Sequence, residues 1–275
     1  MTPTGPRTPP RTSPRPDGDL VVERVPWSVL GPGFVEVWGR FDPRNPQPEH
    51  MECIGQNGSG KSFFIGQVMA EMTRRRDTNF VFVATKPADR TISSMGLETV
   101  DTVREQRRLE RCLFWPRTSR TGRARTAYQA SRIQELLDSI WADDQGNITV
   151  IFDEFARVES MTPDLKETLG MYLREGRSHG ITVVAGKQRA QGVNRDLHAE
   201  TRVTVVFPVK DDDDKERLAQ VLGNRRALLP VMRTLSLKDH EFILKHEQAD
   251  SLFISWIDKP VDVAAVMKAK RSYRR

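Results

Sequence analysis

Apolar residues in this chain gather into short, nearly continuous runs. The main runs are residues 79–84, 112–115, 148–152, 181–185 and 202–207. Between two of them, in 124–141, apolar side chains recur at the spacing of one helix face: Ile133, Leu136, Leu137 and Ile140. Strands that are apolar throughout and alternate with helices are typical of a parallel sheet covered on both faces. The pattern therefore predicts an α/β fold with a mostly parallel central sheet.

Further elements follow from the same pattern and from local signals. Residues 50–54 read as a strand, and residues 63–72, 163–177 and 212–222 as helices, with Thr162 as an N-cap before Pro163. Segments 241–245 and 252–257 predict a C-terminal β-hairpin. These elements lie in a main domain, predicted over residues 50–262.

The two ends of the chain differ from this domain. Residues 1–20 are rich in Pro, Thr and Arg and predict a disordered tail. Residues 21–25 and 35–38 suggest two strands around a Gly31–Gly33 turn, so 21–49 is predicted as a short β region that ends in a loop at 43–48. Residues 263–275 are predicted as a basic tail.

Composition narrows the class of protein. Apolar residues make up 37% of the 275, and no run approaches the roughly 20 residues of a membrane-spanning helix. The N-terminus has no apolar secretory segment. The two cysteines, Cys53 and Cys112, lie in apolar runs and are interpreted as buried thiols. We therefore expect no membrane insertion and a cytoplasmic location, which would be the host cytoplasm for a viral protein.

One eight-residue stretch carries the strongest chemical signal. It fits G-x-x-x-x-G-K-[ST], the phosphate-binding P-loop, and comprises Gly55, Gln56, Asn57, Gly58, Ser59, Gly60, Lys61 and Ser62. It stands between a predicted strand and a predicted helix, as a P-loop requires. Lys61 would reach the terminal phosphates of ATP, and Ser62 would coordinate Mg²⁺. The alternative is a chance Gly/Ser-rich turn.

Asp153 and Glu154 directly follow the apolar run 148–152. Behind a P-loop, Asp153 is predicted to hold Mg²⁺ beside Ser62, and Glu154 to act as the general base for water. Alone, such a pair is equally consistent with a helix N-cap or a solvated loop. Gln188 follows the next apolar run, 181–185. If the two strands are neighbours, its amide lies near the γ-phosphate; otherwise it is a surface glutamine in a turn.

The segment 172–189 resembles the FtsK/HerA superfamily of DNA-pumping ATPases. There, a G-R-x-x-G-I-x segment leads into a strand that ends in T-Q-R, as Gly176–Arg189 nearly does. Thr85-Lys86-Pro87 resembles the D-x-K segment of the second strand, and Leu222-Gly223 also fits. The resemblance covers about residues 51–223. Lys187 stands where the family usually has Thr, and Ala190 where Pro often follows.

The resemblance implies a RecA-like P-loop NTPase fold and a ring, usually a hexamer, that threads double-stranded DNA. It also implies an arginine supplied by the neighbouring subunit, for which Arg177 is the first choice and Arg174 the second. Either could instead be a cation favoured at a helix C-terminus. A docking protein (a portal, pore or relaxosome) is an expected partner.

Charge agrees with an anionic partner but is a modest signal. The formal net charge is +6 and the pI about 9.5. The densest basic stretch holds Arg104, Arg107, Arg108 and Arg111 at helical spacing, followed by further arginines to Arg125. A DNA-binding face and a solvated helix face are both consistent with it.

The sequence thus predicts an ATP-hydrolysing motor that moves double-stranded DNA, in genome packaging or DNA transfer. Two further readings stay open: the ATPase subunit of a tailed-phage terminase, and a nucleotide-gated scaffold that does not pump. An ABC-type ATPase is disfavoured, because no L-S-G-G-Q signature precedes the acidic pair.

Overall fold

The computed structural model describes residues 22–38, 49–75, 79–86, 88–143, 147–188, 195–223, 225–247 and 251–269. The predicted N-terminal tail and the predicted loop at 43–48 lie outside these residues. So do Arg189, Ala190 and residues 270–275 of the predicted basic tail.

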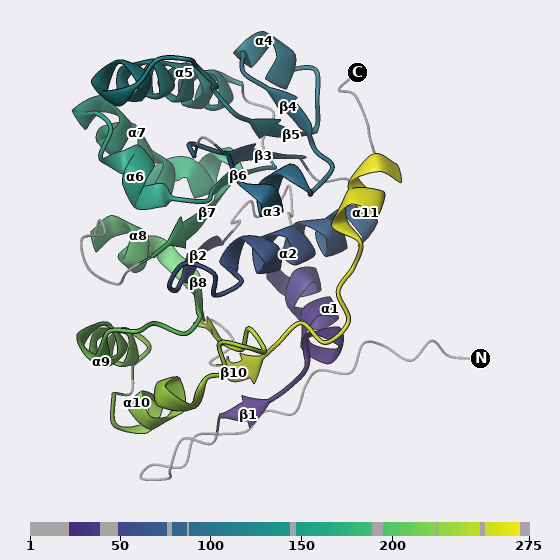
Figure 1. The fold of residues 1–275 in the computed structure, drawn as a ribbon, viewed down its shortest axis with the longest axis vertical. Helices are drawn as coiled ribbons and strands as arrows, with labels where there is room; N and C mark the ends of the chain where they lie inside the picture. Colours follow the sequence, from purple (N-terminus) through teal and green to yellow (C-terminus); the bar gives the residue numbers. More distant parts are fainter. Residues whose placement is uncertain are drawn as a thin grey trace.

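A ten-stranded sheet forms the centre of the described structure, in the order β1-β10-β9-β8-β2-β7-β6-β3-β5-β4 (Figure 1). Neighbouring strands are parallel except where β9 pairs antiparallel with β8 and β10. The predicted C-terminal hairpin is therefore confirmed as β9 and β10. The strands are β1 Glu23–Arg24, β2 His50–Ile54, β3 Asn79–Val83, β4 Glu98–Val100, β5 Arg111–Phe114, β6 Ile148–Phe152, β7 Ile181–Lys187, β8 Thr201–Val206, β9 Phe242–His246 and β10 Ser251–Ser255.

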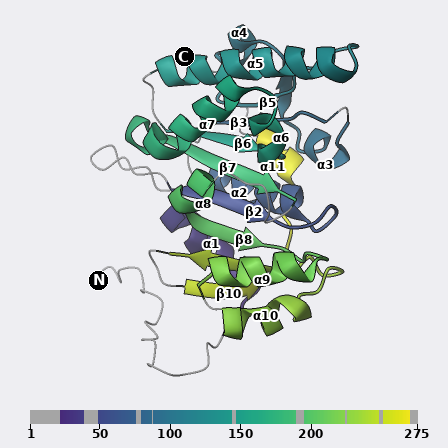
Figure 2. The ribbon, with the colours of Figure 1, turned by 90° about the vertical axis from the view of Figure 1, so that its left-hand side faces the viewer.

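Helices cover both faces of the sheet, as predicted. One face carries α1, α2, α3 and α11, and the opposite face carries α5 to α10 (Figures 1 and 2). The helices are α1 Trp27–Trp38, α2 Lys61–Arg75, α3 Arg90–Ser93, α4 Val103–Gln106, α5 Gly122–Ala142, α6 Phe155–Glu159, α7 Pro163–Glu175, α8 Arg195–Glu200, α9 Asp212–Val221, α10 Arg225–Thr234 and α11 Val263–Ala269. None of these helices is long and apolar enough to cross a membrane.

The continuous apolar runs are explained by burial on two sides. Successive side chains of a strand point to opposite faces. In β3, Phe80 and Phe82 pack in the core beneath α1 and α2, whereas Val81 and Val83 pack in the core beneath α5 and α7. A strand that is buried on both faces has no polar position left to alternate.

The parallel register brings three strand ends to one edge of the sheet. β7 lies between β2 and β6, with Ile54 opposite Lys187 and Phe152 opposite Ala185. The segments that leave the carboxyl ends of β2, β6 and β7 therefore emerge side by side. Sites in open α/β sheets form at such an edge.

The prediction of a short N-terminal β region is largely wrong. Only Glu23–Arg24 is a strand, and it pairs with β10; residues 27–38 form helix α1, through the Gly31–Gly33 segment that was predicted as a turn. Trp27, Phe34 and Trp38 lie on one buried face of this helix, and Trp27 packs 5.1 Å from the ring of Phe64 in α2. This burial offsets the penalty of about 3 kcal/mol for a proline inside a helix.

Other boundaries shift because of tertiary contacts. The predicted helical row of Arg104 to Arg111 is wrong, since α4 ends at Gln106 and Arg111 begins the buried strand β5. The helix predicted over 163–177 is α7 to Glu175, followed by a 3₁₀ turn at Gly176–His179; its N-cap bond from Leu165 N–H to Thr162 is confirmed. Val263–Ala269, predicted as tail, is helix α11 and buries Met267.

Candidate nucleotide-binding and hydrolysis site

The P-loop sequence forms the predicted strand–loop–helix turn. Gly55 to Gly60 connect β2 to α2, and Lys61 and Ser62 are the first residues of the helix. Gly58 and Gly60 have φ angles of 75° and 104°, in a region that side chains disfavour. Glycine at these two positions lets the loop curl over the helix N-terminus, where backbone N–H groups favour an anion.

Lys61 lies folded back onto its own loop. Its Nζ donates to the carbonyl oxygens of Gly55 at 2.7 Å and Gln56 at 2.9 Å. Burial lowers the pKa of Lys61, although Asp153 acts in the opposite direction. The cation is held beside the loop by bonds that a phosphate oxygen could replace.

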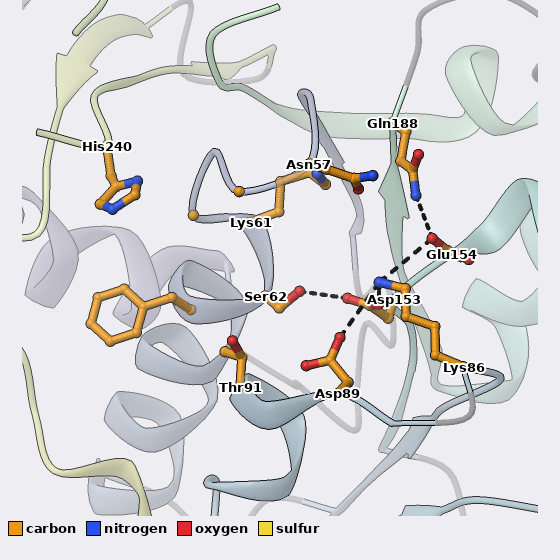
Figure 3. A pocket seen from close by; sticks show the side chains of 13 residues that line it. Asn57, Lys61, Ser62, Lys86, Asp89, Thr91, Asp153, Glu154, Gln188 and His240 are labelled. Carbon is orange, nitrogen blue, oxygen red and sulfur yellow. Dashed lines mark hydrogen bonds and ion pairs between the residues drawn. The ribbon is translucent and has the colours of Figure 1, made fainter. Parts of the chain in front are cut away.

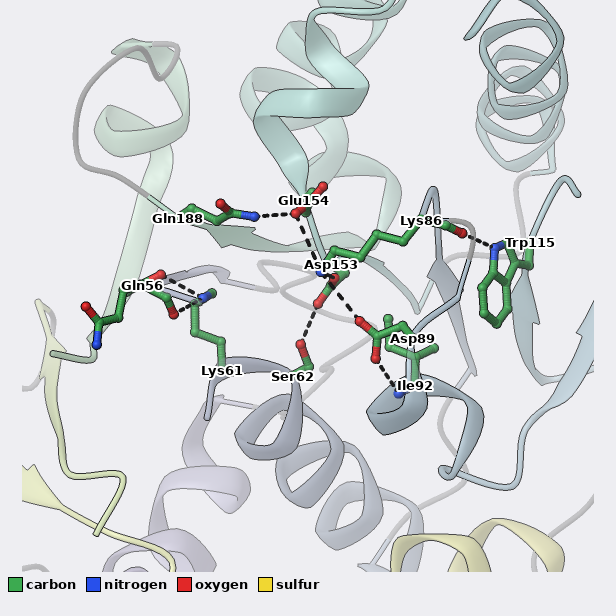
Figure 4. Close-up of polar contacts among 11 residues, drawn as sticks. Gln56, Lys61, Ser62, Lys86, Asp89, Ile92, Trp115, Asp153, Glu154 and Gln188 are labelled. Carbon is green, nitrogen blue, oxygen red and sulfur yellow. Dashed lines mark hydrogen bonds and ion pairs between the residues drawn. The ribbon is translucent and has the colours of Figure 1, made fainter. Parts of the chain in front are cut away.

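The acidic pair lies opposite this helix N-terminus. Ser62 Oγ donates to Asp153 Oδ1 at 2.5 Å, and Lys86 Nζ lies 2.8 Å from Asp153 and 3.5 Å from Glu154 (Figures 3 and 4). Burial would lower the pKa of Lys86, but Asp153, with smaller effects of Glu154 and Asp89, outweighs it, and the pKa is raised to about 12. Lys86 therefore keeps its positive charge and balances both carboxylates.

The Ser62–Asp153 contact fits a magnesium ion. Magnesium prefers oxygen ligands and usually takes one or two from protein, with substrate phosphates and water completing its shell. A hydroxyl and a carboxylate that already meet at 2.5 Å supply two such oxygens. In the described part of the chain, no group of three or more His, Cys, Asp or Glu side chains is arranged as a metal site. An ion bound here would thus depend on phosphate oxygens.

Gln188 lies beside the acidic pair, as expected if β6 and β7 are neighbours. Those strands do pair, and Gln188 Nε2 donates to Glu154 Oε1 (Figure 4). The strands approach closely here, because a Cβ on Gly186 would lie 2.4 Å from the carbonyl oxygen of Asp153. The absence of a side chain at Gly186 thus lets β7 bring Gln188 to Glu154.

Lys187, where the sequence departs from the family pattern, has an internal partner. Its Nζ donates to Glu52 Oε2 at 2.6 Å, and both side chains are buried. The other Glu52 oxygen contacts His198 Nδ1 at 2.8 Å and the Thr204 hydroxyl at 3.1 Å. Burial would raise the pKa of Glu52, but the bonds from His198 and Lys187 lower it.

The two arginines considered as fingers lie far from this chain's own P-loop. Arg174 is in the last turn of α7, and Arg177 is in the turn that enters β7. Arg177 lies near enough to His50, the first residue of β2, to lower its pKa. Both arginines are therefore at the amino ends of strands whose carboxyl ends bear the site.

The basic stretch is largely engaged within the fold. Arg107 donates to Ser139 Oγ at 2.9 Å and Arg125 to the Thr85 carbonyl at 2.9 Å. The Arg117 guanidinium lies 4.4 Å from the ring centre of Trp115. These contacts give structural roles to side chains that the sequence offered as a DNA face.

Five residues that line the site's cavity were not predicted from the sequence: Phe63, Lys86, Asp89, Thr91 and His240. Lys86 was part of the family resemblance without an assigned role, and His240 is one of the histidines whose spacing in the sequence indicates no ligand site. Lys86 and His240 line a cavity of about 450 Å³ together with P-loop residues, Asp153, Glu154 and Gln188 (Figure 3). The D-x-K-like segment was a signal for Lys86, whereas a histidine 180 residues beyond the P-loop had none.

Comparison with known proteins gives the fold. No family model matches the sequence, and no curated protein matches it. The genome packaging NTPase B204 of Sulfolobus turreted icosahedral virus 2, in complex with sulfate, has a TM-score of 0.56 at 13% identity, over 79% of this chain and 98% of that one. The cytoplasmic domain of the Thermomonospora curvata type VII secretion ATPase EccC gives 0.56 at 20% identity, over 84% of this chain and 28% of that one.

A third similar structure is the pCW3 conjugation coupling protein TcpA with ATPγS, with a TM-score of 0.53 at 14% identity, over 82% of this chain and 66% of that one. These proteins are P-loop ATPases of the FtsK/HerA type. The fold expected from the resemblance of residues 172–189 is therefore confirmed: this chain shares with these proteins a mostly parallel central sheet flanked by helices.

Proposed function

We propose that this chain is an ATP-hydrolysing motor that moves double-stranded DNA as a ring. The observation that carries the proposal is the convergence of three segments at one sheet edge. The P-loop brings Lys61 and Ser62, β6 brings Asp153 and Glu154, and β7 brings Gln188. This convergence supports the proposal, because ATP hydrolysis needs a phosphate-binding lysine, oxygen ligands for Mg²⁺ and a base for water within one site.

The roles follow from the contacts. Lys61 leaves the carbonyls of Gly55 and Gln56 to hold the terminal phosphates. Ser62 and Asp153 would hold Mg²⁺, which neutralises phosphate charge when bound. Glu154 takes the proton of the attacking water. Gln188 donates to Glu154. Its amide would also hydrogen-bond the γ-phosphate and so respond to hydrolysis.

The choice of DNA rests on charge and on the similar proteins. B204 is described as a packaging ATPase and TcpA as a conjugation coupling protein. A net charge of +6 favours an anionic polymer. Arg104, Arg108 and Arg123 are exposed and would contribute to DNA contact. A cytoplasmic motor, hexameric and docked on a portal, pore or relaxosome, is part of the same proposal.

The arginine finger is proposed to act on the neighbouring subunit's site. Arg174 is exposed, whereas Arg177 is half-buried beside His50, so Arg174 is the better placed of the two. Mixing tests this assignment. Arg174→Ala keeps its own P-loop site, and Glu154→Gln keeps its arginine. If the finger acts in trans, mixing these two variants restores part of the ATPase rate. The same mixture made with Arg177→Ala tests the other arginine, and no gain with either arginine variant contradicts the assignment of a finger to this pair.

The decisive measurement is the ATPase rate with and without duplex DNA, together with the mass in solution with a non-hydrolysable ATP analogue. We expect DNA to raise the rate and the analogue to stabilise a ring. Lys61→Ala should abolish turnover. A monomer whose rate ignores DNA would contradict the motor proposal. A ring without DNA-stimulated turnover would instead support the scaffold reading.

A second candidate is a motor that moves protein. The secretion ATPases EccC and EssC share the fold, and EccC has the highest sequence identity of the three structures compared above, 20%. Hydrolysis would then use the same residues, since the sheet edge is unchanged. ATPase activity that is independent of duplex DNA but stimulated by a polypeptide would favour this candidate.

A further inference from the structure

The cavity at the P-loop continues past the residues that would handle phosphates. Glu154 and Gln188 line one end of it, and His240 stands on the other side of the P-loop (Figure 3). Phe63 and Thr91 also line the cavity. Because the γ-phosphate is assigned to the end with Glu154, the nucleoside must extend toward the end with His240.

Two of the side chains that line this cavity carry rings, His240 and Phe63. Phe63 follows Ser62 in the first turn of α2, and 38% of its surface is exposed, although it is a large apolar side chain. Most phenylalanines of this domain are buried, either in the core beneath α1 and α2 or in the core beneath α5 and α7. An exposed phenyl ring that lines a cavity offers its face to a flat ligand.

The backbone of His240 is held in an unusual conformation. Its φ of 51° lies in the left-handed region, which only one other described non-glycine residue, Asn147, adopts. Contacts within the turn maintain it: Ser236 Oγ donates to Asp239 at 2.6 Å, and Ser236 N–H donates to Glu241 at 2.8 Å. Such strain persists only where the surroundings enforce it, and it gathers at ligand sites.

The imidazole ring is fixed to the P-loop itself. His240 Nδ1 lies 3.1 Å from the carbonyl oxygen of Ser59. A carbonyl can only accept, so Nδ1 carries the proton. The ring also lies over Gly60, where a Cβ would come within 3.2 Å of it. The turn before β9 therefore delivers one ring to the nucleotide loop from a part of the chain about 180 residues away.

We propose that Phe63 and His240 form a platform that binds the base of a nucleoside triphosphate by its face. This rests on the proposed function, because it assumes that the phosphates occupy the P-loop. Stacking on an aromatic side chain does not depend on which base is stacked. The platform should thus add affinity for ATP and GTP alike, relative to a triphosphate that has no base.

The test is calorimetric titration with Mg²⁺ and three probes: ATP, GTP and inorganic tripolyphosphate. The variants are Phe63→Ala and His240→Gly, since glycine accepts the left-handed backbone without strain. Leu237→Ala is the matched control, because Leu237 is exposed in the same turn but does not line the cavity. Circular dichroism melting confirms that each variant is folded.

We expect the unaltered chain to bind both nucleotides more tightly than tripolyphosphate. Each platform variant should lose roughly fivefold to a hundredfold in affinity for the nucleotides, the range of one stacking contact, and keep its affinity for tripolyphosphate. Leu237→Ala should change neither affinity.

Two results would overturn the platform while leaving the P-loop assignment intact. One is equal affinity for ATP and tripolyphosphate in the unaltered chain. The other is an equal loss for both ligands in His240→Gly, which would mean that the histidine shapes the loop and does not touch the base. Failure of the unaltered chain to bind any of the three probes would instead refute the proposed function.

Discussion

Two clusters of charged side chains lie on or next to strands β2 and β7 but differ in how their charges are satisfied. At the carboxyl ends, Lys61, Asp153 and Glu154 surround a cavity, and the bonds they make can be exchanged for those of a ligand. Within the same strands, Glu52 and Lys187 are buried and bond to each other. His198 and Thr204 contact the other oxygen of the Glu52 carboxylate. The first cluster is open and the second is closed.

The difference shows that one sheet can keep the side chains proposed to react with a ligand apart from charged side chains that stabilise the fold. In a low-dielectric interior an unpaired charge is costly, so the closed cluster must satisfy itself. At the sheet edge, water or a ligand can supply the hydrogen bonds that the protein itself does not provide. A residue of the open cluster should therefore affect turnover more than folding, and a residue of the closed cluster should affect folding more than turnover.

The largest expected effect is on turnover in the open cluster. Glu154→Gln should lower the ATPase rate by about 10²- to 10⁴-fold, the typical contribution of a general base. Its free energy of unfolding should stay within about 0.5 kcal/mol of the unaltered chain's. Glu167→Gln makes the same chemical change on the exposed side of α7 and serves as control. Undiminished turnover would remove Glu154 from the mechanism.

Next in size is the loss of one charge from the closed cluster. Lys187→Met leaves Glu52 buried without its cation and should cost about 3–5 kcal/mol in urea denaturation. Replacing both partners, with Glu52→Gln and Lys187→Met together, should recover much of that loss, because no buried charge remains. A double variant as unstable as the sum of the two single variants would show that the pair is not the source of the effect.

His50 gives the third prediction, since it precedes Glu52 on the same face of β2. Its Nε2 donates to the Leu173 carbonyl and its Nδ1 accepts from Val183 N–H, both at 3.0 Å. Burial, with a smaller effect of Arg177, lowers the pKa of His50 from 6.5 to about 4, although the bond to Leu173 opposes this. The folded chain thus resists protonation between these pH values, whereas the unfolded chain does not.

Stability should accordingly fall as the pH drops from 6.5 to 4, by about 3 kcal/mol from this residue alone. His50→Gln can both donate and accept but does not titrate, so its stability should fall less over the same interval. Parallel curves for the two proteins, measured by urea denaturation at each pH, would contradict the assigned hydrogen bonds.

The smallest effect concerns one neutral group of the closed cluster. Thr204→Val removes the hydroxyl that donates to Glu52 Oε1 at 3.1 Å and keeps the shape of the side chain. The cost should be about 1.5 kcal/mol, the lower end for a hydrogen bond to a charged group. A lower midpoint of thermal unfolding, with unchanged turnover, would support a structural role. A loss of turnover without a loss of stability would contradict it.

The sequence was most informative where chemistry fixes the residue types. Gly58, Gly60, Lys61 and Ser62 indicated the loop, and the apolar run before Asp153 indicated the strand that positions it. It failed for residues 27–38, because the Gly-Pro-Gly signal is local, while the burial of Trp27 against Phe64 involves a helix about 40 residues away. It also failed for Arg111, which is buried in β5 with Glu110 beside it.

By itself, the sequence determined the P-loop, the acidic pair, the α/β class and the likeness to FtsK/HerA ATPases, since these depend on spacing and on patterns within short segments. Only the tertiary structure decided that β7 lies between β2 and β6, that Lys187 closes onto Glu52, and that His240 reaches the P-loop. The contacts of β7 with β2, of Lys187 with Glu52 and of His240 with the P-loop join residues more than 100 positions apart. Strand order, which no local pattern encodes, brings them together.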